Sequence, residues 1–219
     1  MKNDYTHIAV ILDRTGSMES IREDTIGGFN AFVNQQKAEP GVATLTLVQF
    51  DSQDPYEIVH NFKPVGAVPA LTRETFVPRA STPLLDAMGR GINDLEKSLA
   101  EIQEEEKPSR VVMVIITDGQ ENASHEFRKD QIAKMIKEKQ EQSAWQFVFL
   151  SADLAAIGDA LASGIRANSS IRFSPSAQGT AAAWASASAR VADYRADRSK
   201  DVSFTAEDRA QQESEEKRK

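Results

Sequence analysis

Apolar residues along the chain form two kinds of pattern, short unbroken runs and longer stretches with helical spacing. The runs at residues 8–12 (IAVIL) and 111–116 (VVMVII) contain only apolar side chains, many of them β-branched. Such runs indicate strands that are buried on both faces of a sheet. Elsewhere, as in residues 84–102, apolar residues recur every three or four positions, which predicts amphipathic helices. Strands that alternate with helices predict a mainly parallel sheet with helices on both faces.

The same patterns divide the rest of the chain. Predicted strands cover residues 8–12, 42–50, 56–62, 111–116, 145–150 and 170–173, and predicted helices cover residues 18–39, 83–102, 126–140, 154–164 and 177–194. Only residues 51–55 connect the second and third strands, which is too short for a crossover, so the third strand should be antiparallel. We therefore expect a doubly wound α/β fold with a six-stranded, mainly parallel sheet whose edge strand, 56–62, is antiparallel.

The domain should cover residues 1–195 and be followed by a tail. From residue 196 onward the chain is charged, Phe204 is the only large apolar residue after Val202, and residues 211–219 contain none. A segment that buries so little apolar surface does not offset the entropy lost on ordering. The sequence therefore predicts that residues 196–219 form a charged, disordered tail.

Acidic and hydroxyl side chains follow both unbroken runs. Asp13, Thr15 and Ser17 follow the first run at alternate positions, and Asp118 follows the second. In open α/β sheets ligands bind beyond the carboxyl ends of the strands, where the winding reverses. The long loop at residues 63–82 should deliver Thr82 to the same edge, as the N-cap of a helix whose first residue is Pro83.

The resulting set is two carboxylates and three hydroxyls, without Cys or His. Oxygen ligands of this kind suit Mg²⁺, Mn²⁺ or Ca²⁺ better than Zn²⁺. By themselves, residues 13–17 fit a β-turn followed by a helix cap at Ser17 as well as they fit a metal site.

Three segments together resemble the motifs of von Willebrand factor type A (vWA) domains. Residues 13–18 (DRTGSM) resemble the DxSxS motif, with Thr15 in place of the first serine, residues 81–87 (STPLLDA) resemble the threonine loop, and residues 116–119 (ITDG) resemble the later aspartate motif. The likeness covers about residues 5–195 and is greatest to stand-alone bacterial and phage members. It implies a metal-ion-dependent adhesion site (MIDAS) in which Thr15, Ser17 and Thr82 contact the ion directly. Asp13 and Asp118 would then bond to it mostly through water.

The resemblance also implies a function. An ion held mainly by neutral hydroxyls stays electrophilic and attracts an external carboxylate. We therefore expect an interaction module, not an enzyme, that binds an Asp or Glu of a partner protein, and related proteins work with an AAA+ ATPase or in multi-protein assemblies. Arg14, inside the site loop, is expected to face the partner, and Asn122 to support the site; for Asn122 the role of a plain turn residue is an equal alternative.

Two rival functions stay open at this point. A metal-dependent phosphotransferase or phosphatase of the haloacid-dehalogenase type also begins with an acid at a strand end, but it needs a second acid where this chain has Thr15, and no lysine loop is evident. The other rival is a structural vWA module with an inactive site.

Composition and net charge limit the kinds of partner and the location that we expect for the protein. The net charge of −7 argues against nucleic acid, and no apolar stretch is long enough for a signal peptide or a membrane span. The chain has no cysteine, which fits a reducing compartment. We expect a cytoplasmic protein that does not bind a membrane.

Overall fold

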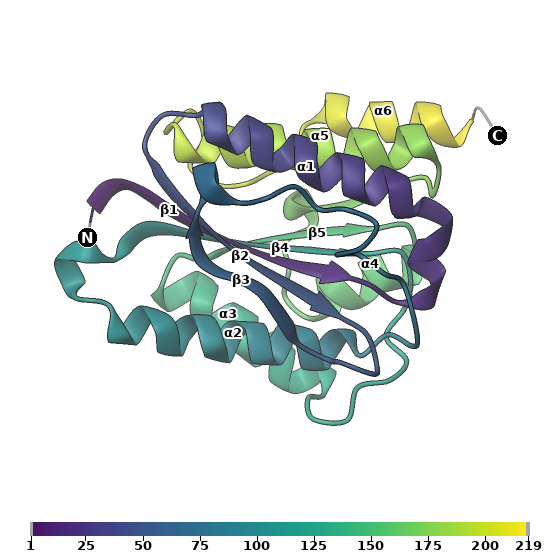
Figure 1. Cartoon of the computed structure of the whole chain (residues 1–219), viewed down its shortest axis with the longest axis horizontal. Coiled ribbons are helices and arrows are strands. Elements are labelled where there is room, and N and C mark those ends of the chain that lie inside the picture. Colours follow the sequence, from purple (N-terminus) through teal and green to yellow (C-terminus); the bar gives the residue numbers. More distant parts are fainter. Residues whose placement is uncertain (1, 218–219) are drawn as a thin grey trace.

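Six strands form one sheet at the centre of the molecule (Figure 1). The computed structural model describes residues 2–217, and the sheet order is β3-β2-β1-β4-β5-β6. The strands are β1 (Lys2–Asp13), β2 (Val42–Phe50), β3 (Glu57–Pro64), β4 (Pro108–Thr117), β5 (Gln146–Ser151) and β6 (Ser170–Arg172). The unbroken apolar runs lie in β1 and β4, the two central strands, and their side chains are buried.

Helices cover both faces of this sheet. They are α1 (Arg22–Ala38), which follows the 3₁₀ turn Gly16–Ile21, α2 (Leu84–Glu101), α3 (Lys129–Gln142), α4 (Leu154–Ala162), α5 (Ala177–Arg195) and α6 (Ala206–Glu216). Figure 1 shows α1, α5 and α6 on one side of the strands and α2 and α3 on the other. Two apolar cores result: one joins the sheet to α1 and α5, and the other joins it to α2, α3 and α4. None of the helices within residues 2–217 combines the length and the apolar character needed to cross a lipid bilayer.

The strand directions confirm the predicted architecture. β1 pairs in parallel with β2 on one side and with β4 on the other, and β4–β5 and β5–β6 are also parallel pairs. β3 is antiparallel to β2 and lies at the edge, as the short 51–55 connection requires. The winding reverses between β1 and β4, so the carboxyl ends of these two strands meet at the point where open α/β sheets bind ligands.

Two helices begin later than the sequence predicts. α2 starts at Leu84 with Pro83 at the cap position, so Thr82 lies one residue before the cap. α3 starts at Lys129, not at residue 126. Its predicted first turn is held in a loop because the backbone N–H groups of His125, Glu126 and Phe127 donate to the carboxylate of Asp86.

Residues 196–217 do not form the disordered tail that the sequence predicts. Val202 and Phe204 are buried in the core on the α1 and α5 side of the sheet, and α6 packs against α5. A capping box begins α6, because Thr205 N–H donates to Asp208 Oδ2 over 2.8 Å and Asp208 N–H donates to Thr205 Oγ1 over 3.2 Å. Gln212 is buried and its Nε2 donates to Gly179 O over 3.1 Å. Our prediction was wrong here because it weighed apolar side chains, whereas α6 docks through polar ones. Residues 1, 218 and 219 lie outside the described residues.

Candidate metal centre

The carboxyl ends of β1 and β4 bring two acidic loops together. Leu12 on β1 is paired with Ile116 on β4, so Asp13 and Asp118 leave the sheet from neighbouring positions. Thr117, the last residue of β4, donates from Oγ1 to Asp13 Oδ2 over 2.5 Å. The side chains of these two strand ends are therefore directly linked.

Hydrogen bonds connect four of the five predicted ligands. Thr15 N–H donates to Asp13 Oδ1 over 2.7 Å, and the hydroxyls of Thr15 and Ser17 lie 3.2 Å apart. Ser17 Oγ in turn donates to Asp118 Oδ1 over 2.7 Å. Asp13 and Thr15 are buried, whereas Ser17 is exposed, so the chain of oxygens runs from the interior to the surface.

Thr82 reaches the same loops through its backbone. Thr82 N–H donates to Asn122 Oδ1 over 2.8 Å, and Asn122 N–H donates to Thr82 O over 3.1 Å. Two residues earlier, Ala80 O accepts from Gly16 N–H over 3.1 Å. The segment before α2 is thus tied to the loop after β1 on one side and to the loop after β4 on the other, with Asn122 supporting Thr82.

The surroundings of the Asp13 and Asp118 carboxylates disfavour their negative charge. Asp13 has no exposed surface, and burial raises its pKa to about 7, against the opposing effect of hydrogen bonds from Thr117 and Thr15. The neighbouring charge of Asp118 raises it further, and burial also raises the pKa of Asp118. Neither carboxylate forms an ion pair with any residue that the structure describes. Two carboxylates in such surroundings favour a bound cation.

The donor set fits a hard divalent cation held largely by hydroxyls. Within residues 2–217 no group of three or more His, Cys, Asp and Glu side chains is placed to hold a metal. An ion at this site would therefore depend on Thr15, Ser17 and Thr82 as well as on the two carboxylates. Neutral oxygen donors without sulfur or imidazole suit Mg²⁺, Mn²⁺ or Ca²⁺.

The Arg14 side chain is turned inward and is not presented at the surface, contrary to our expectation that it faces a partner. Its side chain is buried, its Nη2 lies 2.7 Å from Asp51 Oδ2, and its Nη1 forms an ion pair with Glu57. The guanidinium is drawn to the β2–β3 side of the sheet because Asp51 follows β2 directly. Asp51 lies 37 residues away in sequence, so nothing within residues 13–17 revealed the pairing.

Asp51 holds the loops around the site in place. Its Oδ2 also accepts from Arg79 Nε over 2.9 Å, while Arg79 N–H donates to Arg14 O over 2.9 Å. Burial by itself would raise the pKa of Asp51, but hydrogen bonds from Gln53 N–H, Arg14, Asp54 N–H and Arg79 outweigh it and hold the pKa below its usual range. Asp51 therefore stays ionised and joins the loop after β1 to the segment that carries Thr82.

Two further carboxylates, those of Asp86 and Glu121, fix the loop after β4, and the sequence did not lead us to predict their role. Buried Asp86 accepts the three backbone N–H groups described above, and Glu121 accepts from Ala123 N–H, Ser124 N–H and Leu85 N–H. Both carboxylates bind this loop to the first turn of α2. The signal in the sequence was an acid in a predicted first helical turn beside a long polar loop, which needs side-chain acceptors for its backbone.

No family model matches the sequence, and no curated protein sequence matches it. Solved structures are similar at low identity. A von Willebrand factor type A structure from Catenulispora acidiphila aligns with a TM-score of 0.54 and 12% identity over 86% of this chain and 42% of that one. Proximal thread matrix protein 1 from the mussel byssus, solved with a zinc-occupied MIDAS motif, aligns with a TM-score of 0.58 and 12% identity over 88% of this chain and 47% of that one. The manganese-loaded TRAP protein of Plasmodium vivax aligns with a TM-score of 0.54 and 14% identity over 78% of this chain and 69% of that one.

These comparisons define the fold class. At 11–14% identity they show the fold alone, and this chain has the α/β fold of vWA domains. The chain corresponds to less than half the length of the mussel and Catenulispora chains.

Proposed function

We propose that the protein is an interaction module that holds a divalent cation at the ends of β1 and β4 and binds a partner's Asp or Glu through it. The observation that carries the proposal is the hydrogen-bonded series Asp13–Thr15–Ser17–Asp118, with Thr82 tied to the same loops. Mg²⁺ is the expected ion, with Mn²⁺ and Ca²⁺ as alternatives. Two proteins of the same fold bind manganese and zinc, and for zinc the site is a MIDAS.

Each residue has a defined role in this proposal. Thr15, Ser17 and Thr82 contact the ion through their hydroxyls, and Asp13 and Asp118 act mostly through water. The bound ion supplies an electrophilic position for an anionic oxygen. At about 4 Å and an effective dielectric near 20, each pair of unit charges is worth roughly 4 kcal/mol before desolvation. Asn122, Asp51 and Asp86 hold the three loops at the separation that the ligands require.

The phosphotransferase alternative is not favoured. Asp13 would be its nucleophile, but Asp13 has no exposed surface and both of its carboxylate oxygens accept hydrogen bonds. Thr15 occupies the position where such an enzyme has its second acid, and the Thr15 N–H is one of the groups that donate to the Asp13 carboxylate. This geometry suits a carboxylate that orients neighbours better than one that attacks a substrate.

Metal binding is the first test. A ligand that binds only the folded state, present at about 100 times its dissociation constant, adds about 2.7 kcal/mol to stability. The melting temperature should rise with Mg²⁺, Mn²⁺ or Ca²⁺ and fall with EDTA, with Zn²⁺ titrated in parallel. Asp13→Ala and Thr82→Ala should abolish this response in a folded protein, and Asp130→Asn, on the exposed start of α3, should keep it. Absence of any metal-dependent shift at millimolar ion would refute the site.

Partner binding is the second test. Proteins that co-purify with the chain should do so with Mg²⁺ and not in EDTA, and should be lost with Asp118→Ala. Changing one particular Asp or Glu of the partner to Asn or Gln should also release it, because an amide keeps the shape but not the charge. Binding that persists undiminished in EDTA would refute the carboxylate mechanism. The vWA resemblance points to an AAA+ ATPase or a multi-protein assembly as the partner, and to a protein of bacterial or phage type. A cytoplasmic location, which we also propose, is consistent with a chain that has no cysteine.

A further inference from the structure

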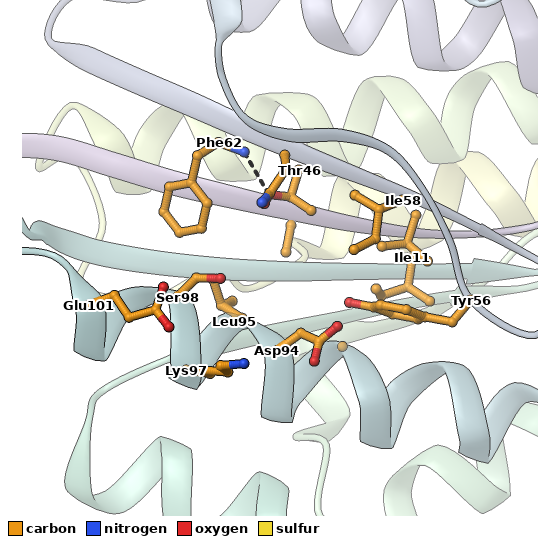
Figure 2. A pocket seen from close by; sticks show the side chains of 14 residues that line it. Ile11, Thr46, Tyr56, Ile58, Phe62, Asp94, Leu95, Lys97, Ser98 and Glu101 are labelled. Atoms are coloured by element: carbon orange, nitrogen blue, oxygen red, sulfur yellow. Dashed lines mark hydrogen bonds between the residues drawn. The ribbon is translucent and has the colours of Figure 1, made fainter.

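A cavity of about 240 Å³ lies between α2 and the β3 side of the sheet (Figure 2). Ile11 and Val48 from the strands and Leu95 from α2 line its apolar interior, and all three are buried. It lies over the middle of the strands and contains none of the candidate metal ligands. Its chemistry is therefore separate from that of the metal centre.

Aromatic side chains border this cavity at both ends. Figure 2 shows Tyr56 and Phe62 at opposite ends of the gap between the strands and α2. Phe62 has a φ of 43° at a register irregularity of the β2–β3 pair, and its N–H donates to Thr46 Oγ1 over 3.1 Å. A positive φ at a non-glycine residue redirects its side chain, and here the ring lies on His7 with 3.9 Å between the ring centroids.

Carboxylates line the helical wall. Asp94 and Glu101 both border the cavity, and two helical turns, about 10 Å, separate them on one face of α2. Lys97 is the one basic residue in the lining, which leaves two carboxylates against one ammonium. Burial and the charge of Asp94 raise the pKa of Tyr56 against the opposing effect of the nearby Arg90 charge, so its phenol stays neutral. Two aromatic rings and an excess of negative charge favour a cation.

The cavity continues into a longer groove. A second hollow of about 550 Å³ shares Phe62, Ser98 and Glu101 with the first and extends to Val42. Val42 and Ile58, which line the two hollows, are 46% and 45% exposed and are among the few large apolar side chains left open to solvent. Within the described residues, β3 has a strand neighbour on one side only. We call this feature, from Ile58 and Tyr56 to Val42, the β3–α2 groove.

We propose that the β3–α2 groove binds an extended segment of a partner protein, with a lysine or arginine side chain inserted between Tyr56 and Phe62 beside Asp94 and Glu101. Alternate side chains of an extended segment point to the same side. A basic residue flanked at two positions on either side by apolar residues can thus place its charge in the cavity and its apolar neighbours against the adjoining parts of the groove. A free amine would fill the cavity but leave most of the groove open, so we assign the cation to a polypeptide.

The test uses the full chain and defined peptides. The probe is acetyl-Val-Thr-Lys-Thr-Val-amide, its match carries norleucine in place of lysine, and n-butylammonium represents the free amine. Binding is followed by NMR chemical-shift changes in the ¹⁵N-labelled protein, at low salt and with EDTA. The lysine peptide should shift resonances of β3 and α2, bind several-fold tighter than the norleucine peptide, and exceed butylammonium in affinity. EDTA separates this test from that of the proposed metal site, because the groove needs no ion.

Matched variants locate the contact. Asp94→Asn and Tyr56→Leu should each weaken the lysine peptide about threefold, while Asp130→Asn on α3 should leave its affinity unchanged. The norleucine peptide should be insensitive to Asp94→Asn. Equal affinity for the two peptides, shifts confined to other parts of the molecule, or butylammonium binding as tightly as the peptide would each overturn the proposal.

Discussion

Asn122 and Thr82 exchange two hydrogen bonds across loops that lie 40 residues apart in sequence. The Thr82 N–H donates to the Asn122 side chain over 2.8 Å, and the Asn122 N–H donates to the Thr82 carbonyl over 3.1 Å. The loop after β4 thereby fixes the backbone from which the Thr82 hydroxyl projects. In the function we propose, Asn122 positions Thr82 at the metal centre and is not itself a ligand.

Replacement of Asn122 should therefore weaken metal binding without unfolding the protein. Asn122→Ala removes the acceptor of the Thr82 N–H, and loss of such supporting contacts lowers metal affinity about 10-fold or more. Titration of Mn²⁺, followed by the EPR signal of the free ion, measures this. Gln120→Ala is the control, because Gln120 is exposed and its side chain bonds to Asp153 instead of Thr82. Equal affinities in the two variants would contradict the positioning role.

Asp51→Asn should destabilise the protein strongly. The substitution leaves the buried guanidinium of Arg14 without its one buried counter-charge among the described residues, and such a loss costs about 3 kcal/mol or more. Glu57 also pairs with Arg14 but is 43% exposed at its side chain, so Glu57→Gln should cost less than about 1 kcal/mol. Urea unfolding of the two variants measures the difference. Similar losses in both would show that Asp51 is not the centre of this network.

Acid should weaken the fold through His7. The ring has no exposed surface, its Nδ1 lies 2.8 Å from Thr44 Oγ1, and burial lowers its pKa to about 3. Because the folded-state pKa lies below the unfolded value of 6.5, the unfolded chain binds more protons between these two pH values. The His7 contribution to the free energy of unfolding should be constant above about pH 6.5 and fall by about 1.4 kcal/mol for each pH unit below it.

The measurement is the difference in unfolding free energy between the wild type and His7→Gln from pH 8 to pH 5. The difference is needed because the raised pKa of Asp13 acts in the opposite direction in the same range. A pH-independent difference would mean that His7 titrates normally in the folded protein.

Adjacent glycines of α1 should respond oppositely to alanine. A Cβ at Gly28 would lie 2.1 Å from Cδ1 of buried Trp184, whereas a Cβ at Gly27 would meet nothing within 4 Å. Gly28→Ala should lose about 1–3 kcal/mol through overpacking. Gly27→Ala should gain about 0.5–1 kcal/mol from helix propensity. Thermal unfolding of the pair tests this, and a loss at Gly27 equal to that at Gly28 would contradict the packing shown here.

The sequence by itself determined the fold class and the antiparallel edge strand, and it predicted a candidate site at the ends of two buried strands. The two unbroken apolar runs became the central strands, because only strands buried on both faces tolerate such runs. The connection at residues 51–55 determined that β3 is antiparallel, because a chain that short cannot cross over. The alternate spacing of Asp13, Thr15 and Ser17 is local, so their convergence followed from sequence positions alone.

The tertiary structure decided features that depend on partners far away in the chain. Arg14 turns inward because Asp51 lies behind it, and α3 begins late because Asp86 holds the residues before it. Residues 196–217 fold because Val202 and Phe204 find a core and the side chain of Gln212 finds the backbone of α5. Sequence periodicity records which face of an element is apolar. It does not show which distant charged or carbonyl group will contact a given polar side chain, and at these positions that contact decided the conformation.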